Sequence, residues 1–165
     1  MNLSFGKRYG LRLAAIGAAC IAGVLIALLG QHVFGMRPCA WCILQRFIFL
    51  LLGLVCIVGS VLHAAWDRRA IAGLALLLSG LGIAAAIYQH EVAAKLASCD
   101  LTLADKVVNA LGLESLWPAM FQVTANCADA HVTMLGLPYE RWSLGLFSIV
   151  ALVSLTLLRW PKYRR

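Results

Sequence analysis

The chain has 165 residues, of which 62% are hydrophobic and only 13% are charged, about half the charged share of a soluble domain. This composition, with a mean hydropathy of +0.87, excludes a disordered tail, a nucleic-acid-binding module and an ordinary cytosolic enzyme. So short a chain cannot bury that much apolar surface within itself, and part of the surface must therefore face lipid. The formal net charge is +7, and its distribution along the chain is more informative than its sum.

Four stretches are long and apolar enough to cross a bilayer as helices, which takes about 20 residues. They cover residues 13–30, 42–62, 70–88 and 142–158. A helix satisfies its backbone N–H and C=O groups internally, as the lipid interior requires. We find no internal repeat or Gly/Ser linker, so we expect one membrane domain over residues 1–165, an all-α four-transmembrane-helix bundle.

The charged residues indicate how these spans are oriented. Nine of the 14 Lys and Arg residues, with one acidic residue, lie before the first span, in the 63–69 loop or in the carboxyl tail. The other side, with its loops at 31–41 and 89–141, carries five basic and six acidic residues. Because basic segments stay in the cytoplasm, we expect both termini inside. We do not expect the first span to be a cleaved signal peptide, because its apolar core is longer than is typical and no cleavage site with small residues follows it.

The six cysteines divide between the spans and the outward side. Two lie within spans and are expected to act as small apolar fillers. Four fall on the outward side, where disulfides persist, and four cysteines allow three pairings. The fillers are Cys20 and Cys56, and the outward four are Cys39, Cys42, Cys99 and Cys127.

Cys39 and Cys42 form a Cys-x-x-Cys motif directly after Pro38, a residue suited to the first turn of a helix. The pair is therefore expected to open the second span at its outer end. Free N–H groups and the helix dipole favour a thiolate there, as thiol–disulfide exchange requires. Half of a zinc site is the alternative, but no second Cys-x-x-Cys exists, and haem attachment would need His in place of Ile43. We expect redox chemistry and no metal.

Cys99 and Cys127 share the long outward loop, and two interpretations of them stand equally. They form either a structural disulfide, worth about 3–4 kcal/mol by loop entropy, or a reactive pair. Their flanking residues are small and polar, which suits attack by the thiol of another protein.

Arg46 lies one helical turn after Cys42, on the same face. An Arg inside a membrane costs roughly 2.5 kcal/mol or more at depth, which makes it a functional candidate. It would stabilise a Cys42 thiolate or hydrogen-bond a carbonyl of an apolar electron acceptor; the alternative is an interfacial Arg that reaches the headgroups. His90, at the outer end of the third span, would assist protonation of the acceptor or is a plain interfacial histidine. Gln31 and His32 have weaker claims.

The long loop contains a helix signal. Thr102-x-x-Asp105 resembles a capping box, and Leu103, Val107 and Leu111 follow at amphipathic spacing. Segments of this kind tend to lie on the membrane surface. We expect short interfacial helices that keep the two cysteine pairs in reach of each other; the alternative is a small packed subdomain away from the lipid.

Together these motifs resemble a known family over nearly the whole chain. The residues concerned are Gln31-His32-Val33, Pro38-Cys39-x-x-Cys42-x-x-x-Arg46, two loop cysteines, and Leu135-Gly136-Leu137 before the last span. They resemble DsbB, the bacterial inner-membrane protein that re-oxidises the periplasmic disulfide donor DsbA. The resemblance implies a multi-pass protein with cytoplasmic termini and a long periplasmic loop that holds short interfacial helices.

The resemblance also implies roles for the four outward cysteines. Cys99 would form the mixed disulfide with a DsbA-like thioredoxin-fold partner. Within this chain, Cys127 would be the disulfide partner of Cys99. Cys39 would exchange with this loop pair, and Cys42 would be the thiolate beside a quinone ring.

The implied cofactor is ubiquinone, or menaquinone without oxygen, held by Arg46 with His90 nearby. Two features depart from the family pattern: the segment 90–99 is short, and Gln45 stands where an acidic residue can occur. Three alternatives remain: a paralogue with a dedicated DsbA-like partner, a vitamin K epoxide reductase-like enzyme, and a non-catalytic scaffold stapled by its cysteines.

Overall fold

The computed structural model describes residues 3–62, 65–93, 102–126, 133–134 and 136–159. Its main elements are four helices, each long and apolar enough to cross a membrane. They are α1 (Leu3–Val33), α2 (Ala40–Val61), α3 (Ala65–Glu91) and α7 (Tyr139–Arg159). The predicted all-α bundle with four spans is confirmed. Three of the helices run several residues past the predicted stretches, because a helix continues into boundary regions that hydropathy alone does not mark.

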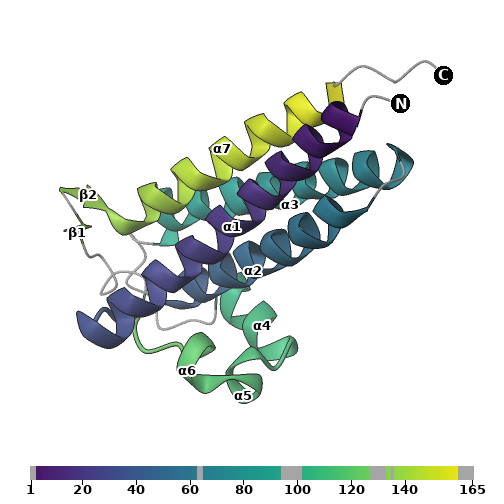
Figure 1. The fold of residues 1–165 in the computed structure, drawn as a ribbon. Coiled ribbons are helices and arrows are strands. Elements are labelled where there is room, and N and C mark those ends of the chain that lie inside the picture. The colour runs from purple at the N-terminus through teal and green to yellow at the C-terminus, as the bar shows by residue number, and fades with distance from the viewer. Residues whose placement is uncertain (1–2, 63–64, 94–101, 127–132, 135, 160–165) are drawn as a thin grey trace.

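The four helices form one bundle in which α1 packs along α2, α3 packs along α7, and α2 contacts α3 (Figure 1). Glycines allow the close approaches. A Cβ on Gly17 would lie 3.0 Å from the carbonyl oxygen of Gly53, and one on Gly82 would lie 2.3 Å from the ring of Phe147. Small residues at such crossings let neighbouring helices gain packing contacts that lipid cannot supply.

The centre of the bundle is apolar. The rings of Phe49 and Phe147 stack in parallel with their centroids 3.9 Å apart, which joins α2 to α7. Cys20 and Cys56 are fully buried in the same cluster, as predicted for small apolar fillers. Outside, large apolar side chains remain exposed along the helices, as a lipid-facing surface requires. They include Leu25, Leu54, Leu77 and Leu152.

Three short helices lie at the end of the bundle opposite to the two termini (Figure 1). They are α4 (Leu103–Ala110), α5 (Leu113–Leu116) and α6 (Pro118–Phe121). A minimal antiparallel pair, β1 (Thr133–Met134) and β2 (Leu137–Pro138), precedes α7.

The predicted capping box begins α4. Asp105 N donates to Thr102 Oγ1, and the Asp105 carboxylate accepts from Thr102 N at 2.8 Å. Ala104 and Val108 are the α4 residues buried against α2, whereas Leu103 and Leu111 from the predicted apolar face stay exposed. The loop helices therefore pack on the bundle through one face and leave a second apolar face open. Their placement at a membrane surface stays a prediction.

Candidate functional site

Cys39 and Cys42 lie at the start of α2, as predicted. Cys39 is the N-cap residue, and Pro38 precedes it, so the expectation that Pro38 sits in the first helical turn is wrong by two positions. Cys39 has an extended backbone, with φ −89° and ψ 171°, as is typical of an N-cap residue, so the first helical residue is Ala40. The two Sγ atoms lie 3.2 Å apart, so that one thiol donates to the other sulfur. The Cys39 side chain is buried and Cys42 is partly exposed.

A buried pair of glutamines adjoins these thiols. Gln89, in the last turn of α3, donates through Nε2 to Cys42 Sγ at 3.3 Å and to Cys39 Sγ at 3.7 Å. Its Oε1 accepts a hydrogen bond of 2.6 Å from Gln45 Nε2. Sequence reasoning did not select Gln89. The signal that could have found it is a strongly polar, uncharged residue directly after the predicted third span, which ends at residue 88 while α3 continues to Glu91.

Arg46 lies one turn deeper in α2 than Cys42, as predicted, and is almost fully buried. Its guanidinium donates to Gln31 Oε1 at 2.5 Å, to the Met120 carbonyl at 3.0 Å and to the Ala27 carbonyl at 3.5 Å. The side chain is thus held between α1 and α6 and does not extend outward. All three acceptors are neutral, so none of them neutralises the positive charge.

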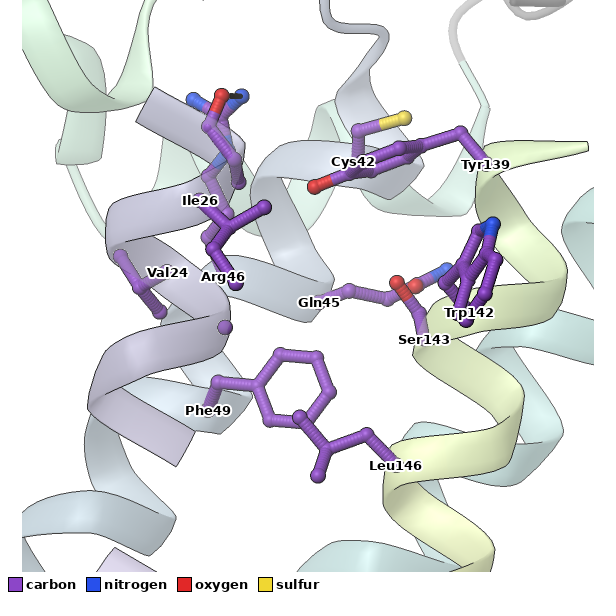
Figure 2. A pocket seen from close by; sticks show the side chains of 12 residues that line it. Val24, Ile26, Cys42, Gln45, Arg46, Phe49, Tyr139, Trp142, Ser143 and Leu146 are labelled. Atoms are coloured by element: carbon purple, nitrogen blue, oxygen red, sulfur yellow. Dashed lines mark hydrogen bonds between the residues drawn. The ribbon is translucent and has the colours of Figure 1, made fainter. Parts of the chain in front are cut away.

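A cavity of about 310 Å³ opens beside this arginine, between α1, α2 and α7. Figure 2 shows Cys42 and the Tyr139 ring at one end of it, and Phe49 and Leu146 at the other. Most of its wall is apolar, and the polar groups come from a few side chains. The polar and titratable residues of the wall are Cys42, Gln45, Arg46, Tyr139, Trp142 and Ser143.

His90 occupies a different place. Its Nδ1 lies 2.9 Å from Glu140 Oε1, where the end of α3 meets the start of α7, and Glu140 is buried. His90 is not among the described residues that line the cavity, so its contact with an acceptor stays a prediction. His32 bonds the Ala119 carbonyl through Nε2 at 3.1 Å, which ties α1 to α6.

The second cysteine pair, Cys99 and Cys127, lies outside the described residues. Their roles and pairing therefore stay predictions. Within the described residues, no group of three His, Cys, Asp or Glu side chains is arranged to hold a metal ion.

The site geometry can be compared with known proteins. The model of the family "Disulfide bond formation protein DsbB" matches residues 10–157. The chain belongs to the DsbB family. A disulfide bond formation protein B from Stutzerimonas stutzeri is 36% identical over 159 residues, which cover 93% of each chain. One from Dechloromonas aromatica is 33% identical over 156 residues, covering 88% of this chain and 90% of the relative.

Membership of the DsbB family gives the thiols at the start of α2 a chemical context. The chain is a multi-pass membrane protein and an oxidoreductase of disulfide bond formation. Cys39 and Cys42 bring two thiols to 3.2 Å from each other at the start of α2, an arrangement from which a disulfide can close.

Proposed function

We propose that this protein takes electrons from a reduced DsbA-like thioredoxin-fold partner and passes them to a membrane quinone, ubiquinone or menaquinone. One observation carries the proposal: the thiol of Cys42 and the guanidinium of Arg46 line the same apolar cavity. A quinone is an apolar two-electron acceptor with carbonyl oxygens. Its reduction in an apolar cavity needs a thiol that donates electrons and a cation that stabilises the oxygen on which negative charge develops.

The cavity residues fit a quinone. A volume of about 310 Å³ is within the range of small-molecule sites, which are mostly apolar with a few placed polar groups. Within the part of the chain that the structure describes, the hydrogen-bond acceptors of Arg46 are neutral, so its charge remains to stabilise an oxygen that becomes negative. A quinone bound here would supply a two-electron oxidant beside Cys42.

The chain's own chemistry is the closure of the Cys39–Cys42 disulfide. Their sulfurs are 3.2 Å apart, so closing the bond needs only a small movement. Joining two thiols releases two electrons and two protons, the number that reduction of a quinone to a quinol consumes. A DsbA-type donor is a strong oxidant at about −120 mV, so its re-oxidation by an ordinary disulfide is uphill by about 1.4 kcal/mol per 30 mV. The re-oxidation of the donor becomes favourable when the quinone removes the electrons from Cys39 and Cys42.

The loop cysteines are proposed as the pair that meets the soluble partner. The partner thiolate attacks Cys99, which breaks the Cys99–Cys127 disulfide and frees the Cys127 thiolate. That thiolate attacks Cys39 and frees Cys42. The second thiol of the partner then closes the partner's disulfide and releases Cys99, whose thiolate attacks Cys127, restores the Cys99–Cys127 disulfide and leaves Cys39 and Cys42 reduced. Three contacts of the described chain support this relay. Ala93 and Ala104, on either side of the segment that holds Cys99, pack in the same buried cluster as Cys39.

The third contact concerns Cys127. Thr124 N donates to the Pro38 carbonyl at 3.0 Å, three residues before Cys127. The chain that leads to Cys127 therefore starts beside Pro38. The loop is thus tied beside the start of α2 on both sides.

The proposed location is the bacterial inner membrane, with both termini in the cytoplasm and the active cysteines in the periplasm. The basic segments support it, because the amino terminus, the 63–69 loop and the carboxyl tail hold nine of the 14 Lys and Arg residues. The termini lie at one end of the bundle and α4 to α6 at the other (Figure 1). Tyr9 Oη donates to the Arg68 carbonyl at 2.9 Å, which links α1 to α3 at the basic end.

The deciding experiment mixes the purified protein with reduced DsbA and a soluble quinone analogue and follows quinone absorbance. Cys42→Ser should abolish quinone reduction. Cys56→Ser, a buried filler in the same helix, should retain it. Normal turnover by Cys42→Ser would end the proposal, and turnover with other thioredoxin-fold clients but not DsbA would indicate a dedicated partner.

A further inference from the structure

The thiol pair has a polar neighbour that the electron route does not use. Gln89 is 6% exposed and Gln45 is 3% exposed. A buried carboxamide is costly without hydrogen-bond partners. For Gln89, the described partners are the two active-site sulfurs on one side and Gln45 on the other. The pair therefore joins the thiols to the cavity wall, which includes Gln45.

The orientation of the Gln89 amide decides its effect on the thiols. Its Oε1 already accepts from Gln45 Nε2 at 2.6 Å, and its Nε2 therefore faces the sulfurs. A hydrogen-bond donor stabilises a thiolate, whereas a carbonyl oxygen in the same place would stabilise the protonated thiol. Gln45 thus fixes which end of Gln89 the sulfurs meet.

The geometry also distinguishes the two sulfurs. Cys42 Sγ is 3.3 Å from Gln89 Nε2, whereas Cys39 Sγ is 3.7 Å away. The contact of 3.2 Å between the sulfurs would serve a thiolate on either cysteine, so the shorter Gln89 contact is what favours Cys42. Cys42 lines the cavity, and Cys39 is not among its described lining residues. Negative charge is therefore favoured on the sulfur that faces the cavity.

We propose that Gln45 and Gln89 act as a pair of positioning residues that place the thiolate of the reduced Cys-x-x-Cys on Cys42. Gln89 donates to the sulfur, and Gln45 holds Gln89 in the donating orientation. Both side chains are neutral, so the pair supplies hydrogen bonds without a carboxylate that would repel the thiolate. The consequence for turnover rests on the proposed function, but the effect on the thiols does not.

The test measures alkylation of Cys42 in the reduced full-length protein across a pH series, with iodoacetamide as the probe and mass spectrometry of the labelled peptide. Gln89→Met keeps the length of the side chain and removes the donor. We expect labelling at neutral pH to slow about tenfold, the effect of losing one charge-assisted hydrogen bond. The midpoint of the pH profile should move upward accordingly.

Gln45→Met should move the profile in the same direction by less, because only the orientation of Gln89 is lost. Gln89→Glu should slow labelling at least as much as Gln89→Met, since a carboxylate neither donates nor tolerates the thiolate. Ser79→Ala is the matched control: Ser79 is also buried in α3, and its hydroxyl donates to the Leu76 carbonyl one turn earlier in the same helix. It should leave the profile unchanged.

An unchanged profile, or faster labelling, in both Gln89 variants would overturn the proposal. That result is expected if the native Gln89 amide presents its oxygen, and not its N–H group, to the Cys42 sulfur. Circular dichroism of each variant identifies any loss of fold, and Gln89→Glu then serves if Gln89→Met does not fold. Neither quinone nor partner enters the alkylation assay. A shifted profile without quinone reduction would therefore refute the proposed function and leave the amide pair standing.

Discussion

Arg46 Nη1 donates to the main-chain carbonyl of Met120 at 3.0 Å, across 74 positions of sequence. Met120 lies in α6, within the loop segment that leads towards Cys127, and the same nitrogen donates to Gln31 on α1. The arginine that lines the cavity is therefore also one of the groups that tie the outer loop to the bundle. A change at this side chain should affect both the acceptor site and the loop.

Replacement of Arg46 by lysine tests this double role. Lysine keeps the charge but cannot form the forked set of hydrogen bonds. The loss of one hydrogen bond to a charged group costs roughly 1.5–3 kcal/mol, so we expect kcat/KM for a soluble quinone to fall at least about tenfold, mostly through KM. Arg141→Lys, an exposed arginine of α7, is the control. An unchanged KM in Arg46→Lys would remove Arg46 from the acceptor site.

The sequence predicted those features that depend on local patterns. The four spans follow from runs of apolar residues, and the place of Cys39 and Cys42 follows from their spacing and from the start of the apolar run. The position of Arg46 one turn below Cys42 follows from helical periodicity, whereas its burial did not follow from the sequence. The Thr102–Asp105 capping box was correct for the same reason, because it is a contact between near neighbours.

The features that were missed come from contacts between distant segments. Gln89 reaches Cys42 across 47 positions, and no local pattern marks which polar residue of α3 meets α2. The pairing of His90 with Glu140 spans 50 positions, and the sequence offered only an unpaired histidine. In α4, spacing identified an apolar face, but the packing of the loop decides that Ala104 and Val108 face the bundle.

The glycine at position 82 should be essential for joining α3 to α7. In Gly82→Ala, the new Cβ would lie 2.3–2.5 Å from ring atoms of Phe147, and that ring stacks on Phe49 beside the cavity. We expect a loss of about 1–3 kcal/mol of stability, as overpacking typically causes. Gly80→Ala is the control, because its Cβ would meet nothing within 4 Å. Thermal unfolding in detergent measures both, and equal melting temperatures would contradict the close packing.

The contact of His90 with Glu140 should act as one unit. We expect His90→Asn and Glu140→Gln each to destabilise the junction of α3 and α7, since each removes the contact of 2.9 Å between His90 Nδ1 and Glu140 Oε1. The double variant should lose less than the sum, with a coupling of about 0.5–3 kcal/mol. A double-mutant cycle on thermal stability measures this. Additive losses would mean that the two side chains do not interact, and a fall in quinone reduction in His90→Asn alone would support the predicted role in protonation.

The bond from Thr124 N to the Pro38 carbonyl, 3.0 Å long, should govern exchange between the two cysteine pairs. Thr124→Pro removes the donor and releases the segment before Cys127, whereas Thr124→Ala keeps the N–H and serves as the control. We expect the proline variant to oxidise reduced DsbA several-fold more slowly. Quinone reduction driven by dithiothreitol should keep its rate, because this small thiol can attack the partly exposed sulfur of Cys42 without the loop pair. The comparison of the two rates separates a relay defect from damage to the cavity: an equal fall in both would show that this backbone bond supports the bundle and does not position the loop.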